Sequence, residues 1–454
     1  IMMMYKKYKE TGYKHIPTIP EHWEIKKHRS FLVEQKSINS NDEGTLLSLS
    51  QYTGVSIKTN TDKQGMFRAE SLVGYRIVHP QDIVMNIMLA WNGSTACSKF
   101  EGVISPAYAV FKVADNGIAP DYLHYLYRIP EMCGYFKAYS TGIIDSRLRL
   151  YPQIFMQLYS VIPPRDEQDQ IVRYLDWQVS KINHLIHSYQ KQIKLLEERK
   201  TTLIDNAVTK GINSDATMQH ISGCWMGNIP AHWRMIPSKR VFVEGKERRR
   251  EGDVSATASQ KYGIISQEEY MRRENRRIVV ANQGLDDWKH VEPGNFVISL
   301  RSFQGGIELC EITGCVTWHY IVLLPQEMVC TQYFKWLLKS KSYIKALQGT
   351  SEFIRDGQDL RYSNFVKVDL PLIPLEEQKA IAEYITAEVA KIDNALPVFQ
   401  KEIELLREYR TRLISDVVTG QIDVRDVVIP EYTPEEDVES SADEDVEEVA
   451  ENAE

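Results

Sequence analysis

Two long stretches of the chain carry apolar residues at alternating steps of three and four positions. This spacing is the 3.5-residue period, on average, of a coiled coil. It predicts two helices of roughly 40 residues, each about 60 Å long at the usual helical rise. The apolar positions are Ile171, Leu175, Val179, Ile182, Ile186, Tyr189, Ile193, Leu196 and Leu203 in the first stretch, and Ile381, Ile385, Val389, Ile392, Leu396, Phe399, Ile403, Leu406 and Leu413 in the second.

The residues at the ends of these stretches are typical of helix termini. Acidic pairs at 166–167 and 376–377 suit the positive end of the helix dipole, and Gly211 and Gly420 follow as caps. Pro397 lies inside the second stretch, where we expect a local kink and not two separate helices.

The segments outside the two long helices have a different pattern of apolar and polar residues. Short strand-like runs stand beside one aromatic-rich amphipathic helix in each half of the chain, which predicts an α+β module. A turn that feeds a strand is expected at 78–84 and at 291–297, further strands at 108–111 and 320–323, and the helices at 121–139 and 331–347.

The chain is a head-to-tail duplication. The segment Ile-Pro-Glu-His-Trp at 19–23 returns as Ile-Pro-Ala-His-Trp at 229–233, an offset of 210 positions (229 − 19). Gln168, in an Ile-Pro-initiated segment, is matched at the same offset by Gln378. A repeat this long is a duplicated domain plus connector, since solenoid repeats are far shorter.

Equivalent contacts between the copies favour a pseudo-twofold axis, which would make the two helices antiparallel. The alternative is that each helix packs only on its own module. We predict an α+β protein with two α/β domains separated by a pair of long antiparallel coiled-coil helices. The expected segments are a first domain at 1–161, a central helix at 162–212, a second domain at 213–372, a distal helix at 373–425 and an acidic disordered tail at 426–454.

Two cations interrupt the apolar stripes at matched places. With the antiparallel centre at Tyr189 and Phe399, Lys200 would lie level with Glu388, and Arg410 with Gln178. A polar contact of this kind can fix the register of a coiled coil. Snorkelling of both side chains at a solvated edge is an equally good interpretation.

The net charge of −8 hides an uneven distribution. Residues 431–454 hold twelve acidic and no basic side chains, so residues 1–430 carry +4 (−8 + 12). A mildly basic folded part permits DNA binding. Six scattered cysteines, no long apolar run and no secretory signal predict a cytoplasmic protein with reduced thiols and no membrane contact.

Motifs for catalysis and cofactors are missing from the sequence. There is no phosphate-binding P-loop, no dinucleotide-binding glycine motif and no Asn-Pro-Pro-aromatic segment. Cys310, Cys315 and His319 do not have zinc-ligand spacing, so buried cysteines are the better interpretation. We therefore expect no cofactor, no metal and no catalytic residue, and we interpret the His-Trp pair of each repeated segment as a structural latch.

The order and spacing of the repeated segments, the two variable modules and the two long helices resemble those of the specificity subunit of type I restriction-modification systems. The resemblance covers nearly the whole chain before the acidic tail. It implies that each variable domain reads one half of a split site on double-stranded DNA, while the helices form the spacer. It also implies docking of two methyltransferase subunits, with restriction subunits joining through the complex, and places the matched Gln168 and Gln378 at the docking segments.

Lys and Arg attract phosphates, and Arg in addition reads guanine. Most single cations are solvated surface charges, although the two dense runs in the second half favour phosphate contact. Two other interpretations stay open: a coiled-coil adaptor that binds no DNA, and an enzyme with an unrecognised site. The candidate DNA-binding residues are Lys58, Lys63, Arg68, Lys99, Arg147, Arg149, Lys246, Arg248, Arg249, Arg250, Arg272, Arg273, Arg276, Arg277, Arg301, Arg355 and Arg361.

Overall fold

The computed structural model divides into two compact units. The first comprises residues 1–190 and 400–454, and the second comprises residues 191–399. The residues that the structure describes are 4–51, 53–58, 71–144, 147–259, 261–275, 285–299, 306–350 and 361–433.

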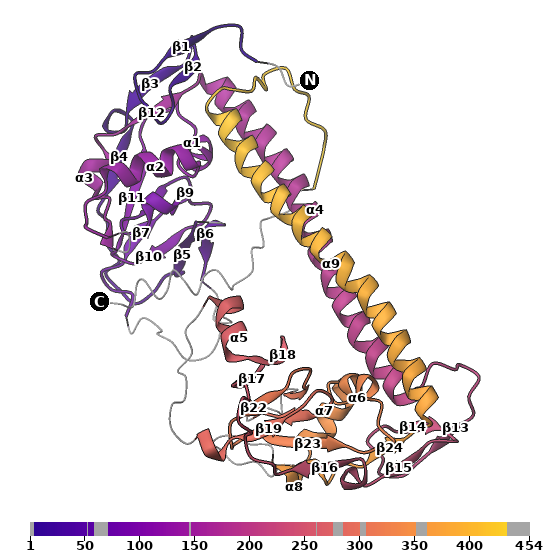
Figure 1. The fold of residues 1–454 in the computed structure, drawn as a ribbon. Helices are drawn as coiled ribbons and strands as arrows, with labels where there is room; N and C mark the ends of the chain where they lie inside the picture. Colours follow the sequence, from indigo (N-terminus) through magenta and orange to yellow (C-terminus); the bar gives the residue numbers. More distant parts are fainter. Residues whose placement is uncertain are drawn as a thin grey trace. The chain divides into compact units, whose positions relative to one another are not determined.

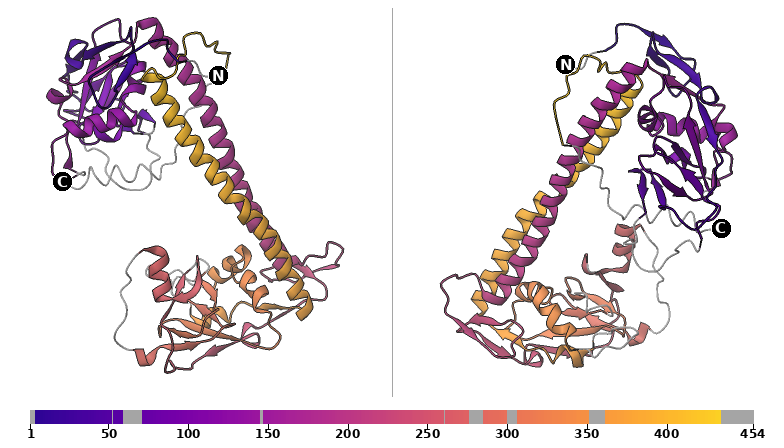
Figure 2. Two further views of the ribbon diagram at one scale, coloured as in Figure 1. Left: turned by 45° about the horizontal axis from the view of Figure 1, so that its top comes forward. Right: turned by 180° about the vertical axis from the view of Figure 1, so that it is seen from behind.

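Two long helices account for both coiled-coil stretches. Helix α4 spans Arg165–Lys210, and helix α9 spans Leu375–Val418 and continues through Pro397 (Figure 1). Each unit contains one half of each helix, and within each unit the two halves run side by side in opposite directions (Figure 2). The heptad pattern and the antiparallel pairing are thus confirmed, and so is a single helix through the proline.

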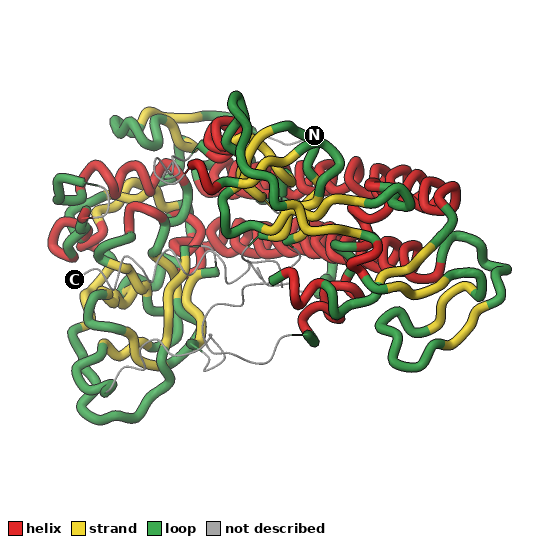
Figure 3. Tube along the Cα trace, turned by 60° about the horizontal axis from the view of Figure 1, so that its bottom comes forward, coloured by secondary structure: helices red, strands yellow, loops and turns green. Residues whose placement is uncertain are grey.

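A four-stranded antiparallel sheet forms the centre of the first module, in the order β4-β11-β8-β9. The module contains four further strand pairs; strands are yellow in Figure 3. The turn and strand predicted at 78–84 correspond to the turn after β7 and the start of β8, and the strand predicted at 108–111 corresponds to β11. The strands are β1 (Tyr8–Glu10) with β2 (Thr18–Pro20), β3 (Glu24–Lys27) with β12 (Tyr159–Ile162), β5 (Leu47–Ser50) with β6 (Gly54–Ile57), β7 (Arg76–Val78) with β10 (Gly102–Ile104), and the sheet strands β4 (Leu32–Gln35), β8 (Ile83–Asn86), β9 (Thr95–Cys97) and β11 (Tyr108–Val113).

The second unit repeats this topology strand for strand. Its sheet has the order β16-β23-β20-β21, and its four strand pairs match those of the first unit. The duplication seen in the sequence therefore extends to every described strand. The strands are β13 (Met218–His220) with β14 (Asn228–Pro230), β15 (Arg234–Ile236) with β24 (Leu370–Leu372), β17 (Ala256–Ser259) with β18 (Gly263–Ser266), β19 (Lys289–Val291) with β22 (Gly314–Val316), and the sheet strands β16 (Phe242–Gly245), β20 (Phe296–Ile298), β21 (Ile307–Leu309) and β23 (Ile321–Pro325).

The single helix predicted beside each sheet is wrong, because two short helices stand there. In the first unit, Pro130 ends one helix and starts the next, since proline suits the first turn of a helix but not its interior. In the second unit, the Ser340 hydroxyl accepts a hydrogen bond from the Tyr343 N–H and so caps a new helix. The short helices are α1 (Pro120–Leu126), α2 (Pro130–Tyr139), α3 (Pro152–Phe155), α5 (Gln267–Glu274), α6 (Thr331–Leu337), α7 (Lys341–Gln348) and α8 (Tyr362–Phe365).

Glycine caps join each long helix to a module. Gly420 follows α9 with φ +75°, and a Cβ there would lie 2.4 Å from the Pro20 ring and 3.1 Å from the Trp23 indole. Gly211 follows α4 with the same φ and lies against Trp233. Both tryptophans are fully buried. The repeated Ile-Pro-x-His-Trp segment thus packs where a long helix ends.

The register of the helix pair differs from the prediction. The Lys200 Nζ lies 2.6 Å from the Asp393 Oδ1, whereas Glu388 pairs with Lys391 on its own helix. Arg410 likewise donates to the Asn183 Oδ1 at 2.9 Å, and not to Gln178. The two observed contacts are copies of each other at the 210-residue offset, with the antiparallel centre displaced by a few residues.

The first part of the segment predicted as a disordered tail is described. After α9, the carbonyls of Val424 and Val427 accept hydrogen bonds from the buried Gln170 amide of α4. The Ser180 hydroxyl donates to the Thr433 carbonyl at 3.4 Å. Residues 426–433 therefore lie along the first half of α4, and residues 434–454 fall outside the described part of the chain.

Candidate nucleic-acid interface

A buried carboxylate ties the first module to the start of α4. The Trp23 Nε1 donates to the Glu167 Oε1 at 3.0 Å, and the His22 Nε2 lies 2.8 Å from the Glu167 Oε2. The Tyr5 hydroxyl also donates to Glu167, and burial raises the pKa of this tyrosine. Three aromatic residues from the N-terminal segment therefore hold one helical carboxylate.

The second unit has the same arrangement with fewer partners. The Trp233 Nε1 donates to the Glu377 Oε1 at 3.1 Å, and the His232 Nε2 lies 2.7 Å from the Glu377 Oε2. The Glu377 side chain is 25% exposed, whereas that of Glu167 is 5% exposed. These contacts agree with a structural latch at each repeat, and each latch consists of Glu167 or Glu377 with its His and Trp partners.

The two matched glutamines are interior residues. The Gln168 Oε1 accepts from the Ala119 N–H, and its amide donates to the carbonyls of Gly117 and Pro163. Gln378 repeats this pattern with Cys330, Met328 and Ile373. Both side chains are almost completely buried. The structure gives them a role in joining helix and module, and their role in subunit docking stays a prediction.

A charged cleft of about 570 Å³ opens on the second module. Strands β16 and β19, with the turns that follow β16 and β22, supply its walls. Two of the predicted cations, Lys246 and Arg248, lie in it, and Trp318 contributes an indole that is 55% exposed and stacks on His319. The lining residues are Glu244, Lys246, Arg248, Asp287, Lys289 and Trp318.

Each cation of the cleft has a nearby oxygen atom. The Lys246 Nζ is 3.8 Å from the Glu244 Oε2, and the Arg248 guanidinium is 3.5 Å from the Asp287 Oδ1. Lys289 donates to the Tyr320 carbonyl at 2.7 Å, and burial lowers the pKa of its ammonium group. The two exposed ion pairs are weak, so Lys246 and Arg248 can exchange their partners for a phosphate or a base at little cost.

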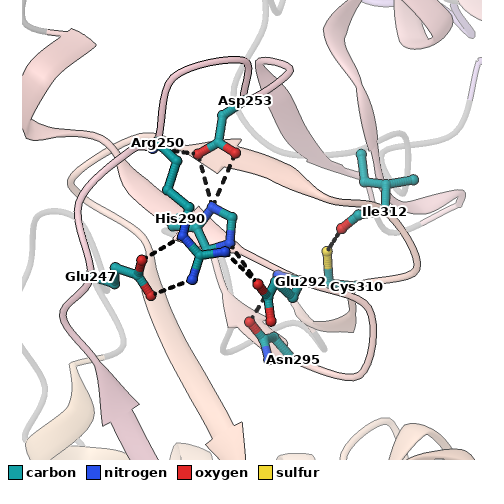
Figure 4. Close-up of polar contacts among 8 residues, drawn as sticks. All are labelled: Glu247, Arg250, Asp253, His290, Glu292, Asn295, Cys310 and Ile312. Atoms are coloured by element: carbon teal, nitrogen blue, oxygen red, sulfur yellow. Dashed lines mark hydrogen bonds and ion pairs between the residues drawn. The ribbon is translucent and has the colours of Figure 1, made fainter.

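Other predicted cations of the second module are held by carboxylates. Arg250 donates to both Glu247 and Glu292 at 2.6 Å (Figure 4). Arg272 and Arg273 of α5 both pair with Glu269. Engaged guanidinium groups are less suited to phosphate than the two cations of the cleft, because a carboxylate must first be displaced.

The Arg250 cluster has a histidine at its centre. The His290 Nδ1 lies 2.9 Å from the Asp253 Oδ2, and its Nε2 lies 3.1 Å from the Glu292 Oε1 (Figure 4). One carboxylate stands at each ring nitrogen, an arrangement that favours the doubly protonated ring. Burial opposes the charge, but the hydrogen bonds from Asp253 and Glu292 prevail and raise the pKa of His290. The cluster fixes the turn after β16 that carries Arg248.

The remaining candidates are dispersed. Lys58, Lys99, Arg147 and Arg361 are exposed, and Arg149 is partly buried and donates to the Leu148 carbonyl. Arg249 is partly buried, and its backbone N–H donates to the Trp288 carbonyl. Trp288 itself belongs to the core. Lys63, Arg68, Arg276, Arg277, Arg301 and Arg355 lie outside the described residues.

Sequence reasoning missed Lys289 and Trp318. Both stand beside the divergent loops, where a search for dense runs of positive charge gives no signal for an isolated lysine or tryptophan. The repeat itself contained a signal, because alignment of Tyr108 with Tyr320 places Trp318 opposite Pro106. The second module therefore has an exposed tryptophan where the first module has an exposed proline.

Other kinds of site receive no support from the described residues. Within those ranges, no group of three or more His, Cys, Asp or Glu side chains is placed to hold a metal ion. All six cysteines are free, and Cys310 and Cys315 are buried. Burial raises the pKa of the Cys310 thiol to about 11. A search of the described helices found none with the length and apolarity needed to cross a membrane.

Comparison with known proteins gives related sequences and folds. The chain is 24% identical over 385 residues to the type I restriction enzyme MjaVIII specificity subunit of Methanocaldococcus jannaschii, covering 76% of this chain and 82% of that protein. It is also 24% identical over 328 residues to the putative MjaX specificity subunit of the same organism, covering 68% and 70% of the two chains. No family model matches the sequence.

Two solved structures have the same fold. The HsdS subunit from Thermoanaerobacter tengcongensis aligns with a TM-score of 0.51 and 14% identity, over 91% of this chain and all of that one. A chain from a type I restriction-modification system, studied for complex assembly and conformational transition, aligns with a TM-score of 0.60 and 12% identity, over 89% and 99%. Together with the sequence relatives, these findings support one family. The chain is similar to type I specificity subunits in sequence and in fold.

The specificity-subunit assignment agrees with the architecture of both units. The mixed α/β modules and the two long helices match the predicted fold class. The comparisons give no support to an adaptor that binds no DNA. Specificity subunits are the non-catalytic members of their enzymes.

Proposed function

We propose that this chain reads a bipartite sequence in double-stranded DNA, with the recognition domains at 1–161 and 213–372 each reading one half. The observation that carries the proposal is the duplicated topology with different surface chemistry in each copy. Every described strand of one unit has a counterpart in the other, yet the turns that border the sheets differ in charge and size. A common scaffold with different loops suits two readers of different sequences.

We also propose that the chain directs methyltransferase and restriction subunits to this DNA in the cytoplasm. Two latches of the same geometry present two equivalent helix ends, which favours two equivalent partner subunits. DNA and these partners are what the names of the related proteins imply. The chain itself would contribute recognition, and the chemistry would lie in the partners.

An exchange of one recognition domain tests the proposal. Residues 19–161 would be replaced by the equivalent domain of another specificity subunit, and the methylated sites of the assembled complex would be mapped. Only one half of the recognised sequence should change. A change in both halves, or in neither, would contradict independent reading by two domains.

A further inference from the structure

The two modules can be compared position by position around the cleft. Strand β19 of the second module is bridged to Arg248 through Lys289, and β7 of the first module is bridged to Ile38 through Arg76. The pairing of β19 with β22 repeats that of β7 with β10, residue for residue. Ile38 and Arg248 therefore occupy equivalent places, as do Arg76 and Lys289.

Part of the chemistry is the same in both modules. Lys36 lies 3.8 Å from Glu34 in the first module, and Lys246 lies 3.8 Å from Glu244 in the second. A cation also stands at the first residue of β7 and of β19. A shared pair of cations at a shared place suits the part of DNA that does not vary with sequence, which is the phosphate backbone.

The remaining chemistry differs between the modules. The position of Arg248 is occupied in the first module by Ile38, an apolar side chain that is 58% exposed. Trp318 stands two residues after β22. The equivalent residue of the first module, two residues after β10, is the exposed Pro106. An arginine and an indole have replaced an isoleucine and a proline on the same scaffold, and both stand in the cleft that also contains Asp287.

The charges of the cleft restrict what can enter it. Glu244 and Asp287 would repel a phosphate placed deep in the cleft, but they can accept hydrogen bonds from the amino group of cytosine or adenine. Arg248 can donate two parallel hydrogen bonds to guanine, and the indole can pack on a thymine methyl group or a sugar. Together these groups suit contact with the edges of bases. The flanking cations would meanwhile bind the DNA backbone.

We infer that Arg248 and Trp318 are specificity-determining residues of the second recognition domain, and that Lys246 and Lys289 are its backbone contacts. Ile38 and Pro106 are the corresponding positions of the first domain. This inference rests on the proposed function and deepens it, because it assigns the choice of bases to two named positions in each module.

The test measures binding by the complete complex with its methyltransferase subunits. Cognate DNA is compared with DNA that carries single base changes in either half-site. Arg248→Ala and Trp318→Ala should each lower cognate affinity roughly tenfold to a hundredfold and reduce discrimination at one or two positions of one half-site. Discrimination in the other half-site should not change.

Matched variants separate base contact from other effects. Lys246→Gln should weaken binding to all sequences alike and reduce the salt dependence by about one counterion. Ile38→Ala should affect only the half-site that the Arg248 variant leaves unchanged. Trp318→Phe retains an aromatic face and should retain most of the affinity, while thermal unfolding verifies that each variant is folded.

The outcomes distinguish the inference from the proposed function. If the wild-type complex discriminates bases in two half-sites but the Arg248 and Trp318 variants keep full discrimination, the inference is wrong and the function stands. Equal loss of affinity on cognate and unrelated DNA would also overturn it, since that is the behaviour of a backbone contact. A wild-type complex without sequence preference would contradict the proposed function itself.

Discussion

At the scale of single residues, the cluster around His290 has no counterpart at the equivalent strand position of the first module. Ile77 stands at the equivalent place in β7, and the corresponding turn of the first module is held instead by the Asn39 amide, which donates to backbone carbonyls. The turn of the second module thus contains a histidine between two carboxylates where the first module has an isoleucine. The two turns therefore respond differently to pH.

The second module should lose stability as the pH rises above the ordinary pKa of histidine, about 6.5. The folded protein raises the pKa of His290, so the stabilisation is fully present below the ordinary pKa of histidine and is lost as the pH passes the raised value. The unfolding midpoint of the intact chain, followed by calorimetry, should fall by a few degrees. His290→Gln should flatten this dependence; an unchanged slope would show that the ring is neutral.

The latches predict an unequal cost of matched substitutions. Glu167 has three hydrogen-bond partners and is almost buried, whereas Glu377 has two and is partly exposed. Glu167→Ala should therefore destabilise the chain by about 1 kcal/mol more than Glu377→Ala, the contribution of one further hydrogen bond. Urea unfolding of the two variants measures the difference, and an equal or reversed order would contradict the role of Tyr5.

The His and Trp residues of the latches could be predicted from the sequence, whereas Lys289 and Trp318 of the cleft could not. The repeat identified His22 and Trp23 as structural, because both copies retain them, and the structure supplies Glu167 as their partner. The cleft was harder to foresee. Lys289 and Trp318 come together with Arg248 only through strand pairing between distant segments, which no local pattern records.

At the scale of secondary-structure elements, the acidic pairs and glycine caps that flank the heptads lie within a residue or two of the observed ends of both long helices. The register was missed by a few positions because apolar stripes interlock nearly as well after a shift of one turn. Two polar contacts, Lys200 with Asp393 and Arg410 with Asn183, distinguish the observed register.

These two contacts should differ in strength. Asn183 is buried, so Arg410→Met leaves an interior amide without this donor and should cost about 1–3 kcal/mol. Lys200 and Asp393 are both partly exposed, and a double-mutant cycle on them should give a coupling energy below about 1 kcal/mol. Strong coupling in the exposed pair and none at Arg410 would reverse this assignment.

At the scale of the whole molecule, the duplicated units share one scaffold and differ in their surface turns. The strand order, the latches and the glycine caps recur in both units, while the turns at the cleft do not. Conservation of the scaffold is explained if equivalent partners must bind equivalent helix ends. Variation of the turns is explained if each unit meets a different sequence.

Footprinting of cognate DNA by the complete methyltransferase complex tests this account most directly. We expect two short protected patches with an unprotected gap between them, and affinity that falls steeply as salt concentration rises. Exchange of residues 19–161 should move protection to a new sequence in one patch and leave the other in place. A single continuous footprint, or protection that does not depend on sequence, would contradict bipartite reading by two duplicated domains.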